Sequence, residues 1–163
     1  MNEQRTPSPT TVKVKIVSPL WRRPPGSPEL PIEPATPGSA GADLRAALAE
    51  SVTIAPGERA KVPTGLAIEI CAPGLAGFVF SRSGLGAKHG LTVAQGVGLI
   101  DPDYRGEIIV WLLNTSEEPR TVSPGERIAQ LVIMPYAAAR FTLAEELGDT
   151  CRGEGGFGHT GSM

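Results

Sequence analysis

The chain has 163 residues, of which 40% are hydrophobic and 20% charged, and this length and composition fit one globular domain with a hydrophobic core. The formal net charge of −2 argues against a basic surface for nucleic acid or a membrane, so positive charge for an anionic ligand must be local. No apolar run approaches the roughly 20 residues that span a bilayer. Nothing at the N-terminus resembles a signal peptide, and Cys71 and Cys151 fit no metal-binding spacing, so we expect a reduced, cytoplasmic protein.

The N-terminal part contains one strand between two irregular segments. Residues 1–10, MNEQRTPSPT, are polar and contain two prolines, and we expect them to be disordered. Alternating apolar and Lys or Ser residues predict a half-buried strand over 12–18. The many prolines of 19–38 exclude a regular helix or a central strand, and so predict a long surface loop.

From Asp43 onward, short apolar runs alternate with turns. Pro-Gly pairs at 56–57, 73–74 and 124–125 suit the central positions of type II turns. Many short strands separated by turn signals predict an all-β sandwich, barrel or jelly roll. The predicted strands cover residues 52–54, 60–62, 66–70, 77–81, 107–114 and 128–135.

Only the internal segment SRSGLGAKHG, residues 81–90, is typical of a helix. Ser83 is a good N-cap, Lys88 favours the C-terminal end, and Gly90 can adopt the left-handed conformation that ends a helix. A serine-capped helix with Arg82 beside it can bind an anion, although an Arg-Ser-Gly turn is more often structural. The segment LAEEL, 143–147, can add a further helical turn.

The segment GLIDPDYRGE, residues 98–107, contains two carboxylates two residues apart, Asp101 and Asp103. One interpretation is a hairpin tip with two solvated acids. The other is that Asp101, directly after an apolar run, is held at the edge of the core and activates water as a general base. Tyr104 then offers a flat face to a sugar or a base. The residues alone leave both interpretations open.

Two further polar positions adjoin predicted strands. Gln130 and Arg127 stand at the start of the apolar run ERIAQLVI, where polar side chains more often serve a turn or a sheet edge than a ligand. Asp43, at a strand start in SAGADLRA, is by itself more often a turn acid than a catalytic one.

The C-terminal segment RGEGGFGHTGSM, residues 152–163, places five glycines around Arg152, Phe157 and His159. Glycines let a backbone lie close to a ligand, while an arginine can bind phosphate and an aromatic ring can stack on a base. Disorder is the common alternative for the last residues of a domain. We interpret the segment as a lid.

Five segments in this order resemble the five motifs of the trimeric deoxyuridine triphosphate nucleotidohydrolases (dUTPases), over roughly residues 12–161. The segments are AGADLRA (40–46), SRSGLGAKHG (81–90), GLIDPDYRGE (98–107), ERIAQL (126–131) and RGEGGFGHTG (152–161). The resemblance implies a distorted jelly-roll barrel of short antiparallel strands with one short helix, in a homotrimer whose sites are shared between subunits. It implies a disordered N-terminus at 1–10, a jelly-roll domain at 11–150 and a mobile lid at 151–163.

The resemblance also implies an activity: Mg²⁺-dependent hydrolysis of dUTP to dUMP and pyrophosphate, which keeps uracil out of DNA and supplies dUMP for thymidylate synthesis. Asp101 matches the base that deprotonates the attacking water, and Asp43 reaches Mg²⁺ through water, the ion being held mainly by substrate phosphates. Neither nucleic acid nor a membrane is an implied partner. The implied catalytic residues are Asp101, Ser83, Arg82 and Gln130. The implied substrate-binding residues are Arg82, Ser83, Gly84, Gln95, Gly98, Ile100, Tyr104, Gln130, Arg152, Phe157, Gly158, His159 and Thr160.

Individual roles follow from the same resemblance. Tyr104 matches the ring under the deoxyribose, where a 2′-hydroxyl would clash. Arg152 matches the arginine on the γ-phosphate, and Phe157 the ring that stacks on uracil. A hairpin spanning about Leu91 to Ile100 reads uracil, largely through backbone groups.

Three positions depart from the family's pattern. Ser81 stands where the family usually has proline, Ala42 where a larger residue is common, and Gln95 where several relatives have an asparagine that helps to hold uracil. Two alternatives remain. A dCTP deaminase of the same fold needs a glutamate-type acid/base near the pyrimidine, whereas IDPDYRG matches the hydrolase motif. A non-catalytic nucleotide-binding regulator, or a structural jelly roll, requires the loss of a catalytic position, and these positions are all present.

Overall fold

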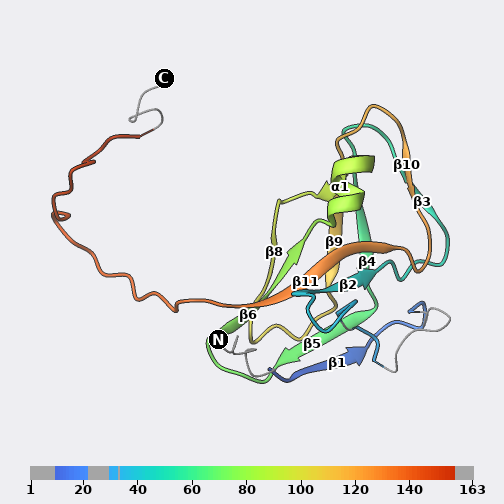
Figure 1. Cartoon of the computed structure of the whole chain (residues 1–163), viewed down its shortest axis with the longest axis horizontal. Helices are drawn as coiled ribbons and strands as arrows, with labels where there is room; N and C mark the ends of the chain where they lie inside the picture. Colours follow the sequence, from blue (N-terminus) through green and yellow to red (C-terminus); the bar gives the residue numbers. More distant parts are fainter. Residues whose placement is uncertain (1–9, 22–29, 33, 157–163) are drawn as a thin grey trace, which may run out of the picture.

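The computed structural model describes residues 10–21, 30–32 and 34–156, and in these ranges the chain forms eleven short strands and one short helix (Figure 1). The all-β prediction is therefore confirmed. The elements are β1 (Val12–Ile16), β2 (Gly41–Arg45), β3 (Val52–Ile54), β4 (Arg59–Pro63), β5 (Leu66–Ile70), β6 (Leu75–Phe80), α1 (Ser83–His89), β7 (Leu91–Val93), β8 (Gly98–Ile100), β9 (Ile109–Asn114), β10 (Arg120–Val122) and β11 (Arg127–Pro135).

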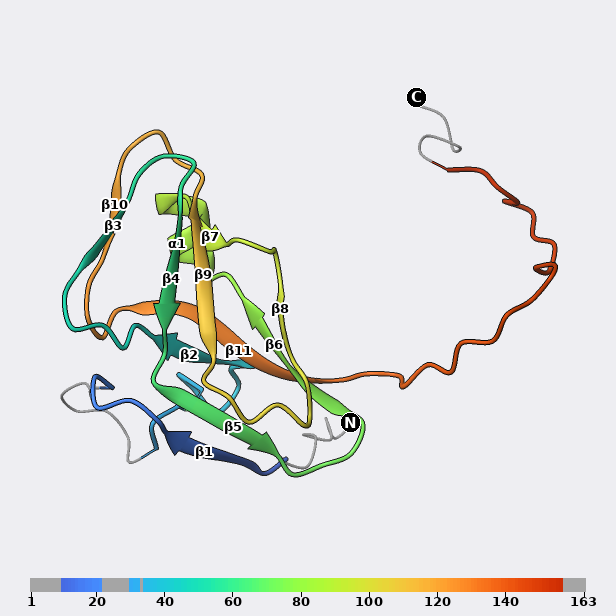
Figure 2. The same cartoon turned by 180° about the vertical axis from the view of Figure 1, so that it is seen from behind.

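The strands pair antiparallel in four small sheets, as expected of a distorted jelly-roll barrel (Figures 1 and 2). The largest has the order β2-β11-β6-β8, a second has the order β4-β9-β7, and two further pairs are β1-β5 and β10-β3. The long strand β11 joins distant parts of the sequence, because Gln130 is in register with Asp43 of β2 on one side and with Phe80 of β6 on the other.

Buried and exposed side chains alternate along the strands, and the buried ones form the core. In β9, Val110, Leu112 and Asn114 are buried, while the intervening Trp111 is 45% exposed. The buried aliphatic side chains of several strands form one cluster, and full burial of such a side chain contributes about 1.5–3 kcal/mol. Asn114 is the one polar residue among these buried residues of β9, and its side chain is hydrogen-bonded, since Nδ2 donates to the carbonyls of Ile54 and Glu118.

Predicted and observed strands agree in position and differ at their ends. The strand predicted over 12–18 ends at Ile16, and the one predicted over 107–114 begins at Ile109. Glu107 lies before the strand, and its side chain accepts a hydrogen bond from the N–H of Gly65 (2.7 Å). The predicted turns are supported by positive φ at Gly57, Gly74 and Gly125.

Helix α1 is confirmed, but its cap is not the predicted one. Arg82 is the N-cap residue with extended dihedrals, Ser83 is the first helical residue, and the cap has no side-chain hydrogen bond. At the other end Gly90 has φ 70°, as predicted, and its carbonyl accepts a hydrogen bond from the N–H of Thr115 (2.8 Å). The predicted helical turn at 143–147 is wrong, since that segment has only a bend. No helix in the described ranges is long and apolar enough to cross a membrane.

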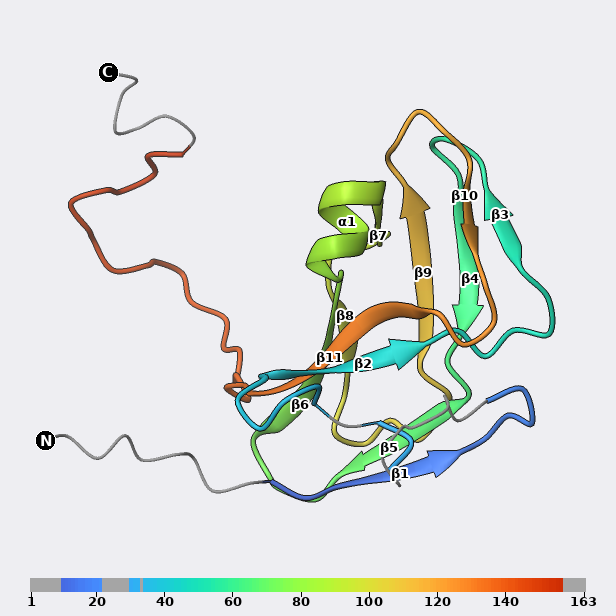
Figure 3. The same cartoon turned by 45° about the vertical axis from the view of Figure 1, so that its right-hand side comes forward.

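After β11 the chain leaves the barrel as an extended arm, residues 136–156 (Figures 1 to 3). Its first residue is still attached, because the N–H of Tyr136 donates to the carbonyl of Gly74 (3.0 Å). Beyond it, residues 137–154 are all exposed.

Candidate active site

An acid with two arginines lies where β2, β11 and the start of α1 meet. Asp43 is largely buried, with 16% of its side chain exposed. One carboxylate oxygen accepts from Arg82 Nε (2.8 Å) and the other accepts from Arg127 Nη1 (3.3 Å). Arg82 also donates to the backbone carbonyl of Arg127 (3.4 Å). The two guanidinium groups are therefore held side by side by one acid.

A third arginine adds positive charge to this cluster. Arg45 lies opposite Arg127 across β2 and β11, and its Nη1 donates to the carbonyl of Gly125 (2.9 Å). Burial of the side chain is the main factor that lowers the pKa of Arg45, and the positive charge of Arg127 is the next. The charge of Arg82 also lowers this pKa, whereas the carboxylate of Asp43 raises it. Three arginines and one carboxylate leave an excess of positive charge here, although the whole chain is slightly negative. This excess favours an anionic ligand.

A pocket of about 400 Å³ opens beside the acid. Its lining includes Asp43, Gln130 and Phe80, which form one row across β2, β11 and β6. Side chains in register on neighbouring strands are close together, so strand pairing brings the amide of Gln130 beside the carboxylate of Asp43.

The N-terminus of α1 borders the same cluster. Ser83 and Gly84 are exposed, and the first intrahelical hydrogen bond runs from the N–H of Gly86 to the carbonyl of Arg82. Earlier N–H groups of a helix have no intrahelical acceptor. Ser81, which replaces the family's usual proline, has a structural role here, since its hydroxyl accepts from the N–H of Val93 (2.8 Å) and connects this segment to β7.

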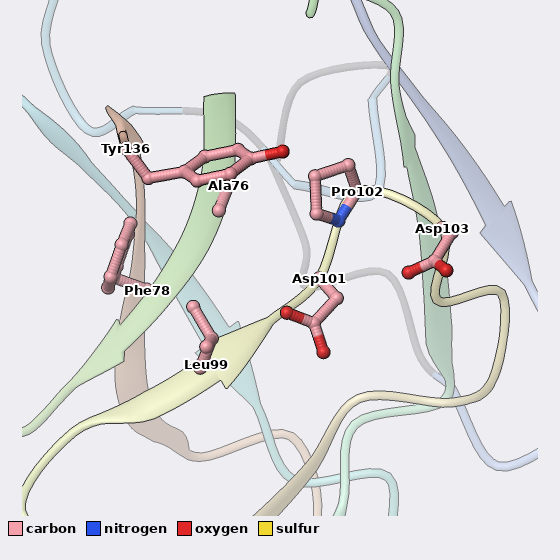
Figure 4. Close-up of a pocket in the computed structure, with 7 residues that line it drawn as sticks. All are labelled: Ala76, Phe78, Leu99, Asp101, Pro102, Asp103 and Tyr136. Carbon is pink, nitrogen blue, oxygen red and sulfur yellow. The ribbon is translucent and has the colours of Figure 1, made fainter. Parts of the chain in front are cut away.

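Asp101 lies in a second region, at the end of β8. It lines a pocket of about 740 Å³, and Figure 4 shows the carboxylates of Asp101 and Asp103 extending from the turn after that strand. The other wall is apolar and contains Phe78, Leu99 and Tyr136. Asp101 is exposed directly after the buried Ile100, at the edge of the core as expected.

Tyr104 is fixed in the turn that follows. Its N–H donates to the carbonyl of Asp101 (3.0 Å), and its hydroxyl donates to the carbonyl of Glu107 (3.0 Å). Arg105 closes the turn further, since its Nη1 donates to the carbonyl of Pro102 (2.7 Å). Tyr104 is nevertheless 44% exposed, so part of the ring is free to contact a ligand.

Strand register separates these two regions within one chain. Ile100 pairs with Gly77, so Asp101 lies near Ala76 at the start of β6. Arg82 lies six residues after Ala76, which corresponds to about 20 Å along an extended strand. The turn carrying Asp101 and the helix α1 accordingly lie at opposite ends of the β6–β8 pair (Figure 3). One chain thus brings together Asp43, Arg82, Ser83 and Gln130, but not Asp101 and Tyr104 with them.

The segment predicted to read uracil has the expected turn but not a simple hairpin. Strands β7 and β8 flank the turn at 94–97, yet β7 pairs with β9 and β8 pairs with β6. Gln95 lines a pocket of about 340 Å³ with Arg59 and Trp111. Its amide nitrogen packs near Gly98, where an added Cβ would lie 3.4 Å away. Of the other predicted positions here, Gly98 and Ile100 are buried in β8.

The remaining predicted residues belong to the arm. Arg152 is exposed and donates from Nε to the carbonyl of Gly155 (2.7 Å), within the arm that extends away from the barrel (Figure 1). Phe157, Gly158, His159 and Thr160 lie outside the described residues.

Sequence reasoning missed two contributors to the cationic region, Arg45 and Arg127. Arg127 is in the segment ERIAQL, where we assigned it to turn chemistry. What identifies Arg127 is its hydrogen bond to Asp43, which is 84 residues away in the sequence. Such a contact depends on the pairing of β2 with β11.

Comparisons with known proteins agree with this arrangement. A family model described as dUTPase matches residues 30–161. The deoxyuridine 5′-triphosphate nucleotidohydrolase of Desulfitobacterium hafniense is 52% identical over 151 residues, which are 93% of this chain and 97% of that protein. The enzyme of the same name from Pseudomonas paraeruginosa is 55% identical over 128 residues, 78% of this chain and 85% of that protein.

Solved structures show the same similarity. The dUTPase of Staphylococcus bacteriophage 80alpha with dUPNHPP has a TM-score of 0.74 and 29% identity, covering 93% of this chain and 99% of that one. A mutant dUTPase from phage phi11 of S. aureus, whose structure concerns the coordination of a structural Mg(II) ion, has a TM-score of 0.70 and 25% identity, covering 85% and 99%. With a family model matched over most of its length, this chain belongs to the dUTPase family.

Proposed function

We propose that this protein hydrolyses dUTP to dUMP and pyrophosphate. The proposal rests above all on one observation: the cationic region around Asp43 and the carboxylate turn at Asp101 are both present, on a chain that belongs to the dUTPase family. A triphosphate carries several negative charges, and the arginines of this region provide the local positive charge that the net charge of the chain does not.

Asp101 is the general base in this proposal. Its carboxylate accepts a proton from the water that attacks the α-phosphorus, while the bond from that phosphorus to the α–β bridging oxygen breaks and pyrophosphate leaves. Arg82, Ser83 and Gln130 bind the phosphates. Because Arg82 is already oriented by Asp43 (2.8 Å), it stabilises the charge that develops on the leaving group with little reorganisation.

Tyr104 provides sugar selectivity. Its exposed ring packs under the deoxyribose, and hydrogen bonds at both ends of the residue hold it there. A 2′-hydroxyl would meet the ring, so UTP is rejected. The turn at 94–97, with Gln95, reads the uracil.

The donor set fits Mg²⁺ held mainly by phosphate oxygens and water. The described residues contain no group of three His, Cys, Asp or Glu side chains, and both oxygens of Asp43 already accept from arginines. Asp43 is therefore suited to reach the ion through water. When bound, Mg²⁺ supplies charge neutralisation at the phosphates.

The separation of the two regions supports a site shared between subunits of a homotrimer. Asp101 and Tyr104 of one copy complete a site with Arg82, Ser83 and Gln130 of another, and residues 151–163 of a neighbour close it as a lid. The arm supports this arrangement, because Phe141, Leu143 and Leu147 are 92%, 103% and 90% exposed in the single chain. A contact with a neighbouring copy would remove these side chains from water, which is favourable.

The activity would keep uracil out of DNA and supply dUMP for thymidylate synthesis, in the cytoplasm. These cellular roles remain predictions from the sequence. Residues 1–9 of the N-terminal segment that we expect to be disordered lie outside the described residues.

The test is a substrate panel. Purified protein with Mg²⁺ is incubated separately with dUTP, UTP, dTTP and dCTP, and pyrophosphate and ammonia are measured. We expect pyrophosphate from dUTP and little from the other three. Equal turnover of all four nucleotides, no turnover of dUTP, or ammonia release from dCTP would each refute the proposal.

A further inference from the structure

Gly106 lies against the hydroxyl end of the Tyr104 ring. A Cβ atom added at Gly106 would collide with the Tyr104 hydroxyl oxygen, and would lie only 2.6 Å from Cζ and 2.9 Å from Cε2. Separations this short between carbon atoms do not persist, so a side chain at position 106 and the present ring position exclude each other.

The backbone does not require glycine at this position. The glycines with positive φ are Gly57, Gly65, Gly74, Gly90, Gly96, Gly125 and Gly153, and Gly106 is not among them. An alanine can adopt the backbone conformation of Gly106 without entering the left-handed region. What the glycine provides is space for the ring.

The hydroxyl end of the ring is hydrogen-bonded in its present position. The Tyr104 hydroxyl donates to the carbonyl of Glu107 (3.0 Å). Glu107 is itself anchored to another loop, since its carboxylate accepts from the N–H of Gly65 (2.7 Å). The hydroxyl end of the ring is thus held against Gly106, while Tyr104 as a whole remains 44% exposed.

We propose that Gly106 is a specificity-determining positioning residue: the absence of a Cβ sets the depth of the Tyr104 ring, and with it the discrimination between a 2′-hydrogen and a 2′-hydroxyl. This inference rests on the proposed function, in which Tyr104 packs under the deoxyribose. A ring displaced by about one ångström no longer matches the sugar, and misplacements of that size can change rates by up to about a hundredfold.

The experiment compares kcat and KM for dUTP and UTP in wild type, Gly106→Ala and the control Gly38→Ala. Position 38 is also outside the left-handed region and has no atom within 4 Å of an added Cβ. In Gly106→Ala we expect KM for dUTP to rise and the ratio of kcat/KM for dUTP over UTP to fall about tenfold or more. The control keeps the wild-type ratio. A wild-type ratio in Gly106→Ala would overturn the inference.

A second background separates an effect on the ring from an effect on the backbone. In Tyr104→Ala the ring is absent, so adding Gly106→Ala should change kcat/KM for dUTP by no more than about twofold. An equally large loss in both backgrounds would overturn the inference, because Gly106 would then act through the turn itself.

Two outcomes remain to be separated. If Gly106→Ala does not fold, the double variant Tyr104→Ala/Gly106→Ala replaces it: without the ring, the added Cβ no longer meets the Tyr104 side chain, so the double variant should fold as Tyr104→Ala does. A double variant that also fails to fold overturns the inference. A wild-type protein that does not distinguish dUTP from UTP refutes the proposed function instead, before Gly106 is tested.

Discussion

Asp101 and Asp103 are two carboxylates in one turn, and the structure distinguishes them. Asp101 directly follows the buried Ile100, and its carbonyl accepts from the N–H of Tyr104, so it is rigidly attached to the core. Asp103 lies two residues further along the turn, and both residues are exposed. A general base needs a fixed position relative to the water that it activates, and this requirement favours Asp101.

We therefore predict that Asp101→Asn lowers kcat for dUTP by about 10²–10⁴-fold while dUTP still binds. Asparagine is of similar size but does not accept the proton. The measurement is pyrophosphate release together with calorimetric binding of dUTP. The matched control, Asp103→Asn, removes the same charge from the same turn and should cost far less. Near-normal turnover in Asp101→Asn, or equal losses in both variants, would contradict the assignment.

Site residues were predictable from the sequence only where a short motif identifies them. The sequence identified residues of SRSGLGAKHG and GLIDPDYRGE as candidates. It did not predict which of these residues lie together in the structure. Arg127 became visible only through its contact with Asp43 at 3.3 Å. Local sequence does not encode which strands pair, and the cationic region is created by that pairing.

At the scale of elements, α1 shows which local sequence signals suffice to predict where a helix begins and ends. Gly90 ends the helix as predicted, with φ 70°. Ser83 is not the cap, because the helix begins one residue earlier than a cap at Ser83 requires and Arg82 takes the cap position. The three-residue strands β7, β8 and β10 were not predicted separately, since a run so short has few positions for an alternating pattern. Strand β3 has the same length and was predicted.

Two glycines of α1 should respond oppositely to alanine. Gly86 is inside the helix, and an added Cβ would meet Thr92 at an ordinary 3.6 Å, so Gly86→Ala should raise the free energy of unfolding by about 0.5–1 kcal/mol. Gly90→Ala should lower it by at least about 1 kcal/mol, since alanine is strained at positive φ and its Cβ would lie 2.9 Å from the backbone nitrogen of Ser116. Thermal and denaturant unfolding measure both. The same direction of change in both variants would contradict this account of the helix end.

At the scale of the whole molecule, the arm is the part of the chain that extends away from the barrel. Its backbone leaves β11 and its apolar side chains are exposed. The glycine-rich character of its end was evident from the sequence, and so was the resemblance to a lid. The place where it docks was not, because in the proposed trimer that contact is made with a neighbouring copy.

Removal of residues 152–163 should eliminate most of the activity and leave the trimer intact. The deletion removes Arg152 and the predicted uracil-stacking Phe157, and it keeps Phe141, Leu143 and Leu147, the side chains that we expect to contact a neighbouring copy. Light scattering gives the oligomeric state and pyrophosphate release gives the activity. Full activity in the deletion variant would show that the segment is not a lid.

The central claim is that Asp101 and Arg82 of one chain serve different sites. Mixing two inactive variants tests it most directly: Asp101→Asn and Arg82→Ala are refolded or co-expressed together at equal amounts, and dUTP hydrolysis is compared with that of each variant alone. In mixed trimers some sites receive Asp101 from one subunit and Arg82 from another, and random mixing should restore about a quarter of the wild-type activity. If both residues serve a site within one chain, no mixed trimer contains an intact site, and the mixture will stay as inactive as its parts.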